Sequence, residues 1–105
     1  MYQVVKRDGK IASFDISKIS SAITKFFEAT HIEYNPYIID LLALRVTADY
    51  QDKIHDGKIT VEDIQDSVED ILSKAGYADV AKAYILYRKQ REKIRNLNST
   101  MLDYK

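Results

Sequence analysis

Apolar residues recur at steps of three and four along most of this chain, which is the spacing of helices that bury one face. The first such segment carries Ile16, Ile19, Ile23, Phe26 and Phe27. Asp15 stands directly before it, where its side chain can cap the first turn, and we expect the helix to fade near residues 29–30. Because a chain of 105 residues can bury one core but not two, we expect a single domain.

Two further segments with helical spacing are bounded by capping and turn residues. One opens at Asn35-Pro36, because proline suits a first helical turn, and we expect it to end at Asp56-Gly57. The other opens with the capping-box-like Thr60-Val61-Glu62-Asp63 and ends at Ala75-Gly76. Their apolar positions are Ile38, Leu41, Leu42, Val46 and Ala48 in the first segment and Ile64, Val68, Ile71 and Leu72 in the second.

A fourth helix is expected from about Tyr77 past Arg91. Its residues at helical spacing are Val80, Ala81, Tyr84, Ile85 and Arg88. The helical pattern breaks over residues 96–100. We therefore assign residues 1–95 to the domain and interpret residues 96–105 as a connector toward a catalytic domain; an ordinary frayed terminus is the alternative.

Two short runs before the helices favour β-strands. Residues 2–6 are rich in β-branched and aromatic side chains, and residues 10–14 make a plausible return strand. Asp8-Gly9 between them is the strongest short hairpin signal. Because two strands alone are only marginally stable, this hairpin must pack on other elements. The sequence predicts a mainly α (α+β) fold, with a hairpin followed by four helices.

Composition excludes several classes of function. The formal net charge is zero, so the molecule as a whole does not attract polyanions. The absence of cysteine rules out disulfides, thiolate chemistry and a zinc ribbon. No apolar run approaches the roughly 20 residues of a membrane span, and residues 1–6 contain no apolar signal core. We expect a cytoplasmic protein.

Catalysis is poorly supported. His31 and His55 both lie near expected helix ends, where a surface position is more common than a catalytic base. No His-x-x-x-His pair, EF-hand loop, Walker A loop or Gly-x-Gly-x-x-Gly fingerprint occurs. The carboxylates of residues 62–70 fit one solvated face of a helix. The chain is therefore not expected to be an enzyme by itself.

Phosphate binding is better supported. In Val5-Lys6-Arg7-Asp8-Gly9 a tight turn can hold Lys6 and Arg7 side by side, and both side chains suit a polyphosphate. Residues 88–95 form a second basic segment that could converge on the same anion. The alternatives are that the basic pair only protects an edge strand and that these segments are solvated faces paired with the acids of residues 62–70.

These residues resemble the ATP-cone family. The opening motif is Val5-Lys6-Arg7-Asp8-Gly9, Phe14-Asp15, Lys18-Ile19 and Ala22-Ile23, and the closing half matches through Thr60 to Ile64, Gly76, Tyr77, Ala81, Tyr84 and Tyr87-Arg88. The resemblance covers about residues 3–95. It implies a small hairpin or short sheet that caps a four-helix bundle. It also implies that ATP or dATP binds between the hairpin and the helices as an effector, accompanied by Mg²⁺.

The resemblance also implies which residues contact the nucleotide. They are Val5, Lys6, Arg7, Phe14, Asp15, Lys18, Arg88 and Lys89. Lys6 and Arg7 resemble the phosphate-contacting pair, and Val5 resembles the residue whose backbone meets the adenine. Two positions depart from the family pattern: Ala12 replaces an acidic residue of some members, and Gln65 replaces a histidine. No catalytic or metal-binding residue is implied.

ATP-cones regulate ribonucleotide reductases, so the resemblance implies a regulatory domain attached to a reductase catalytic domain. In the family, dATP typically switches the enzyme off and ATP keeps it on, with possible nucleotide-dependent homo-oligomers. Residues 95–101 look most like the connector of anaerobic ribonucleoside-triphosphate reductases, the glycyl-radical class that serves DNA replication. The alternative that the whole protein is an aerobic reductase stays open. A transcriptional repressor of the family is disfavoured, because its zinc ribbon needs cysteine.

Two other functions are considered. Residues 88–95 could make the chain a nucleic-acid-binding module, although the zero net charge and the acids of residues 62–70 argue against it, and such binding would fall steeply with salt. A helical module that dimerises through its last helix is the other interpretation.

Overall fold

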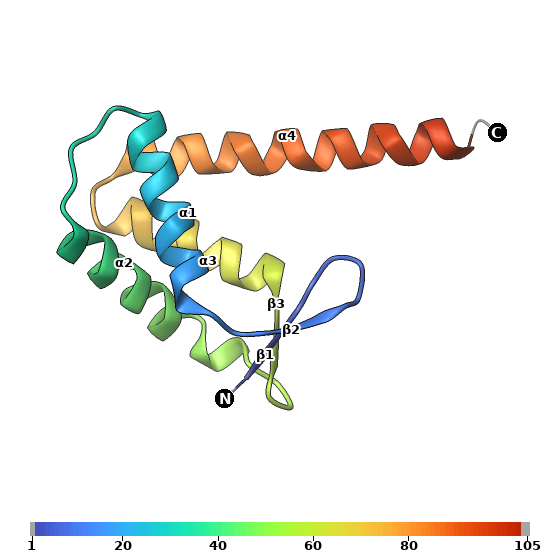
Figure 1. Cartoon of the computed structure of the whole chain (residues 1–105), viewed down its shortest axis with the longest axis horizontal. Helices are drawn as coiled ribbons and strands as arrows, with labels where there is room; N and C mark the ends of the chain where they lie inside the picture. Colours follow the sequence, from blue (N-terminus) through green and yellow to red (C-terminus); the bar gives the residue numbers. More distant parts are fainter. Residues whose placement is uncertain (1, 104–105) are drawn as a thin grey trace.

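The computed structural model describes the backbone of residues 2–103 and the side chains of residues 2–95. Figure 1 shows a helical body with a small sheet at one end and the last helix extending beyond it. The elements are β1 (Gln3–Val5), β2 (Ile11–Ser13), α1 (Ile16–Ala29), α2 (Pro36–Asp49), a 3-10 turn (Gln51–Lys53), β3 (Lys58–Thr60), α3 (Val61–Lys74) and α4 (Ala78–Asp103). The mainly α fold with a small sheet and four helices is confirmed.

The sheet has three strands in the order β2-β1-β3. β1 pairs antiparallel with β2, with Val4 opposite Ala12, and parallel with β3, with Val4 opposite Ile59. We did not predict β3 as a strand. Its three residues are exposed, buried and exposed in turn, and an alternation this short is not enough to indicate a strand from the sequence.

Helix α2 ends earlier than predicted. It stops at Asp49, and Asp56-Gly57 is instead the turn that leads into β3. Asp56 and Gly57 have φ of 53° and 71°, and His55 and Lys58 bridge across them. This left-handed pair closes a tight turn as readily as it ends a helix, which explains the wrong boundary.

The helices bury one continuous core. The fully or nearly buried apolar residues are Ile19, Ile23, Phe26, Phe27, Ile39, Leu42, Ala43, Val46, Tyr50, Ile59, Ile64, Val68, Ile71, Leu72, Val80, Ala81 and Tyr84. The predicted core face is confirmed for α3 and, apart from the exposed Ile16, for α1. In α2 the prediction was partly wrong, because Leu41 and Ala48 are exposed whereas Ile39 and Ala43 are buried. This helix is apolar on two sides, so spacing alone could not identify the inner one.

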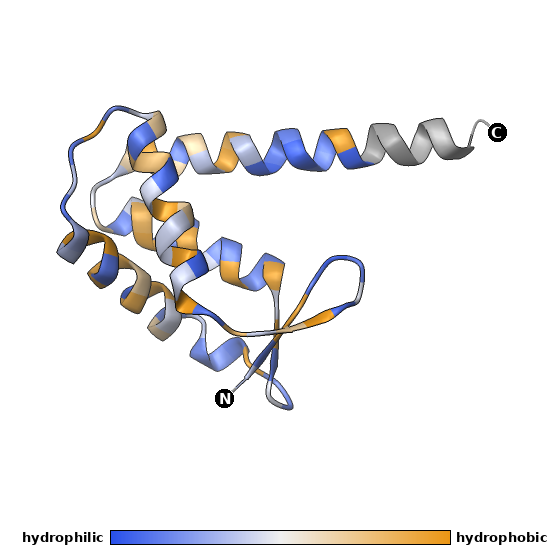
Figure 2. Ribbon diagram, viewed as in Figure 1, coloured by the Kyte–Doolittle hydropathy of each residue, from blue (hydrophilic) through white to orange (hydrophobic). Residues whose placement is uncertain are grey.

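Helix α4 continues to Asp103, through the residues at which we predicted a break. Asparagine, serine and threonine cost only tenths of a kcal/mol each inside a helix, so they need not end one. The apolar residues in Figure 2 lie mainly where the helices meet, and the coloured part of α4 that extends beyond the other helices is mostly hydrophilic. Within the described part of the chain, no helix has the length and hydrophobicity that crossing a membrane requires.

Candidate functional site

A cavity of about 220 Å³ lies between the sheet and helices α1 and α3. Its floor is apolar and includes the buried residues Ile19, Ile64 and Val68. Its mouth carries the exposed cations Lys6 and Lys18. A hollow with an apolar floor and a cationic rim suits a ligand that has one flat apolar part and one anionic part.

Lys6 is held at the cavity by the turn between β1 and β2. The Lys6 amide donates to the Lys10 carbonyl (2.8 Å), and the Gly9 amide donates to the Lys6 carbonyl (2.9 Å). Gly9 has a φ of 85°, a left-handed conformation that favours glycine. The turn therefore fixes the backbone from which the Lys6 and Arg7 side chains project.

Arg7 connects this turn to α3. Its guanidinium donates from Nη2 to Oε1 of Gln65 (3.0 Å), and Gln65 itself lines the cavity. The Gln65 position, which departs from the family pattern, thus anchors a neighbouring cation. The pattern of the sequence could not reveal this contact, because it joins residues of two distant elements.

Phe14 and Asp15 form the edge of the cavity where β2 leads into α1. The Phe14 ring packs on Tyr2, with ring centroids 4.6 Å apart, and the Tyr2 hydroxyl shares a hydrogen bond with the Tyr50 hydroxyl. Asp15 accepts hydrogen bonds from the Ser17 hydroxyl (2.7 Å) and amide (3.0 Å). Both bonds lower the pKa of the Asp15 carboxyl, so it is ionised at neutral pH. The predicted N-cap is confirmed.

Tyr84, a buried residue of α4, also lines the cavity. Burial raises the pKa of its hydroxyl to about 12. The hydroxyl therefore keeps its proton at neutral pH and can donate a hydrogen bond to a ligand. The sequence analysis included Tyr84 in the helical spacing of the last helix and in the family motif, but not among the residues expected to contact the ligand.

A second, more open groove of about 380 Å³ lies beside the cavity, between α3 and α4. Arg7, Arg88 and Lys89 line it together with Glu62, Glu69 and Glu92. Arg88 is already paired there, because its Nη1 donates to Asp66 (3.0 Å) and to Glu69 (2.5 Å). Burial alone would lower the pKa of the Arg88 guanidinium, but these two hydrogen bonds raise it above its usual value.

The structure thus divides the residues that the sequence singled out. Lys6, Phe14, Asp15 and Lys18 line the cavity. The other three cations, Arg7, Arg88 and Lys89, line the neighbouring groove. Val5 lines neither, whereas its neighbour Val4 lines the cavity, because successive side chains of a strand point to opposite faces.

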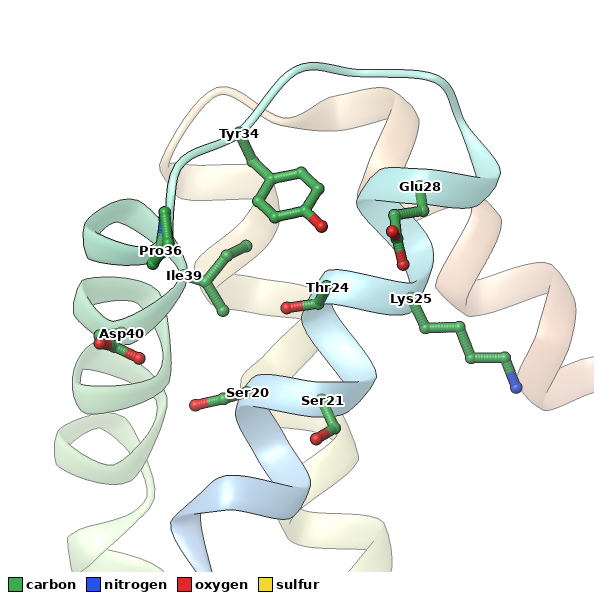
Figure 3. A pocket seen from close by; sticks show the side chains of 9 residues that line it. All are labelled: Ser20, Ser21, Thr24, Lys25, Glu28, Tyr34, Pro36, Ile39 and Asp40. Carbon is green, nitrogen blue, oxygen red and sulfur yellow. The ribbon is translucent and has the colours of Figure 1, made fainter.

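A third hollow, of about 440 Å³, lies between α1 and α2 and is shown in Figure 3. Ser20, Thr24 and Tyr34 contribute hydroxyl groups to it, with Glu28 and Asp40 as carboxylates. Its single cation, Lys25, points away from the loop that carries Tyr34. It contains no residue that the sequence indicated for ligand binding, and two carboxylates disfavour an anion. The cavity beneath the sheet is therefore the better candidate.

Among the described residues, no three or more histidine, cysteine, aspartate or glutamate side chains form a group that could hold a metal ion. A divalent cation at this site would need most of its ligands from the bound molecule and from water.

Comparison with known proteins gives a family match over residues 2–93, to the family described as "ATP cone domain". The chain is 41% identical over 99 residues to the ribonucleoside-diphosphate reductase subunit alpha of Chlamydia pneumoniae, covering 88% of this chain and 9% of that protein. It is 35% identical over 99 residues to a vitamin B12-dependent ribonucleoside-diphosphate reductase of Mycobacterium tuberculosis, covering 94% of this chain and 14% of the relative.

An anaerobic ribonucleoside-triphosphate reductase of Haemophilus influenzae is 35% identical over 100 residues, covering 95% of this chain and 14% of the relative. The chain therefore spans only 9% to 14% of the length of these three proteins.

Proposed function

The chain belongs to the ATP-cone family, and from this premise we propose that it binds ATP or dATP as an allosteric effector of a ribonucleotide reductase. The observation that carries the proposal is the cavity of about 220 Å³ with an apolar floor and a cationic mouth. Complete small-molecule sites usually measure about 300–1,000 Å³. The cavity accordingly takes the adenine and part of the sugar, and the triphosphate lies outside along the cationic rim.

The residues at the site are proposed to contact different parts of the nucleotide, according to their chemistry. Lys6, Arg7 and Lys18 contact the phosphates, because these side chains are exposed at or beside the mouth. Phe14 packs beside the base, and Asp15 fixes the turn from which Lys18 projects. Val5 contributes through its backbone. Arg88 and Lys89 lie in the adjacent groove and reach only the outer phosphates.

Mg²⁺ accompanies the triphosphate in this proposal. Phosphate oxygens and water supply most of its ligands, since the described residues offer no dedicated metal cluster. Magnesium commonly binds in this way to nucleotide phosphates. Its role is to neutralise phosphate charge, and this chain's own contribution is the cationic rim.

Titration calorimetry of the chain with ATP, dATP and GTP in Mg²⁺ buffer tests the proposal. We expect micromolar binding of the adenine nucleotides and much weaker binding of GTP. Each charge-assisted hydrogen bond contributes roughly 1.5–3 kcal/mol, so Lys6→Glu or Arg7→Glu should weaken ATP binding by about 10- to 150-fold. Lys10→Glu is the matched control, because Lys10 is an exposed cation of the same turn that lines neither hollow. Unchanged affinity in folded Lys6→Glu and Arg7→Glu variants would rule out this site.

The whole protein is proposed to be a reductase in which this domain carries no chemistry of its own. ATP and dATP shift its activity only through their different affinities for two states of the protein, and each state in turn prefers its own nucleotide. In this scheme dATP binds more tightly to the inactive state. Copies of the reductase associate with one another in that state, and this association depends on the bound nucleotide. We place the reductase in the cytoplasm.

We further propose an anaerobic, glycyl-radical reductase as the parent, because residues 95–101 resemble the connector of that class. The full-length enzyme should show a glycyl-radical signal in electron paramagnetic resonance spectra after anaerobic activation. Activity that depends on cobalamin, or that persists in air without a glycyl radical, would contradict this assignment.

A further inference from the structure

Helix α2 carries a second apolar face besides the one that it buries in the core. Tyr37 is 84% exposed, Leu41 is 53% exposed and Leu44 is 57% exposed. Ala48 is also exposed. These four residues follow one another at steps of four, three and four, which is the spacing of the a and d positions in a coiled coil. We refer to Tyr37, Leu41, Leu44 and Ala48 as the α2 seam.

The seam points directly away from the body of the domain. The residues that α2 buries are Ile39, Leu42, Ala43 and Val46. At 3.6 residues per turn, the mean direction of the seam lies about 180° around the helix from the mean direction of these four. Figure 1 agrees, because α2 lies at the edge of the helical body. A partner helix could therefore approach the seam without meeting the rest of the domain.

Charged residues flank the seam on both sides. Asp40 precedes Leu41 and Arg45 follows Leu44, so they occupy the g and e positions of the heptad. Both are exposed, and among the described residues the ion pairs all involve Arg88. In a parallel helix pair, a g residue faces the e residue five positions further along the partner helix. Asp40 of each copy then faces Arg45 of the other copy, so a symmetric dimer contains two such pairs.

The same charges disfavour an antiparallel pair. In that arrangement each flank of the helix meets the same flank of its partner. Asp40 would face Asp40 or Thr47 of the other copy, and Arg45 would face Arg45 or Ile38. No attraction between opposite charges would remain, so the seam is complementary to itself in the parallel orientation alone.

We propose that the α2 seam is a docking surface for a second copy of this chain, with the two α2 helices parallel and in register. The helices are already folded within their domains, so no helix has to form on association. The contact spans only two heptads, well below the roughly 1,200 Å² of a stable interface. The dimer is accordingly weak in the isolated chain. No α2 residue lines the cavity or the groove, so the inference does not rest on the proposed nucleotide binding.

Sedimentation equilibrium of the chain without nucleotide, from about 10 μM to 1 mM, tests the proposal. We expect a concentration-dependent monomer–dimer equilibrium that Leu44→Asp abolishes. Leu86→Asp is the matched control, because Leu86 is a similarly exposed leucine (51%) on α4, and it should leave the equilibrium unchanged. A monomer over the whole range, or a dimer that survives Leu44→Asp, would overturn the docking surface.

Charge exchange tests the orientation. Asp40→Arg or Arg45→Asp alone should weaken the dimer roughly tenfold, because two attractive pairs become repulsive. The double variant, or an equimolar mixture of the two single variants, should recover the original affinity. Since the chain has no cysteine, Ala48→Cys should also give a disulfide-linked dimer on mild oxidation, whereas Ser73→Cys on α3 should not. Failure of both the charge rescue and the cross-link in the Ala48→Cys variant would exclude the parallel pair.

Discussion

Ser67 is fully buried on α3, and its hydroxyl has no hydrogen-bond partner within the described structure. A buried polar group without a partner keeps a desolvation cost of about 1–3 kcal/mol. We therefore expect Ser67→Ala to stabilise the domain by roughly 1 kcal/mol more than Ser73→Ala does. The control residue is an exposed serine of the same helix, so it accounts for the higher helix propensity of alanine. Urea unfolding measures both variants, and destabilisation by Ser67→Ala would mean that the hydroxyl is satisfied in solution.

Arg88 illustrates how neighbouring charges can change the role of a residue that the sequence predicted for ligand binding. Its guanidinium is shared by Asp66 and Glu69, so a triphosphate would have to displace these carboxylates before it could bind there. If the proposed site is correct, Arg88→Ala should weaken ATP binding far less than Arg7→Glu does.

The converse variant sharpens this prediction. Removing both carboxylates with Asp66→Asn and Glu69→Gln should strengthen ATP binding several-fold, because it leaves the Arg88 charge free for phosphate. Calorimetry of the variants decides the matter. An Arg88→Ala defect as large as that of Arg7→Glu would show that the carboxylates hold Arg88 ready for phosphate rather than neutralising it.

At the scale of secondary-structure elements, Thr60 joins strand β3 to helix α3. It is the last residue of β3, and its hydroxyl accepts a hydrogen bond from the Asp63 amide at the start of α3 (3.1 Å). Losing a threonine cap costs about 0.5–2 kcal/mol. We expect Thr60→Ala to lower the free energy of unfolding by that amount and Thr60→Ser to retain most of it. Chemical denaturation measures both, and equal stability of the two variants would contradict a capping role.

The helices differ in how far the sequence could predict them. In α1 and α3 the caps and the buried face follow from the sequence, because apolar residues occupy only one side. In α2 apolar residues occupy two sides, and the choice between Leu41 and Ile39 depends on which side meets the core. β3 is too short to show a pattern, since only the tertiary pairing of Ile59 with Val4 makes it a strand.

At the scale of the whole molecule, the candidate site was predictable in part. Lys6 and Lys18 belong to one local motif, and the fold brings both to the mouth of the cavity. The contacts of Arg7 with Gln65 and of Arg88 with Glu69 join distant segments. A spacing pattern within one segment contains no information about such contacts, so the sequence could suggest the cations but not their partners.

The site also joins parts of the chain that are far apart in sequence. The sheet pairs the N-terminal hairpin with β3, and the cavity is bounded by β1, β2, α1, α3 and α4. A ligand that binds there contacts only the folded arrangement, so its binding must stabilise the whole domain. At a hundredfold excess over its dissociation constant, a ligand contributes about 2.7 kcal/mol. For a domain of this size, each kcal/mol raises the melting temperature by about 4–8 °C.

We therefore expect saturating ATP or dATP to raise the melting temperature by roughly 10–20 °C, with a much smaller effect from GTP. At the same nucleotide concentration, Lys6→Glu and Arg7→Glu should reduce this increase by about half or more. Both variants should leave the melting temperature without nucleotide nearly unchanged, because both side chains are exposed. Lys10→Glu should retain the full increase. Differential scanning calorimetry measures the melting temperatures of all three variants.

If the nucleotide-free melting temperatures of Lys6→Glu and Arg7→Glu fell as well, their loss of binding would reflect a damaged fold, and the site would have to be tested with milder glutamine substitutions. An equal increase with GTP would mean that the cavity does not recognise the base, and that the phosphates alone account for the stabilisation.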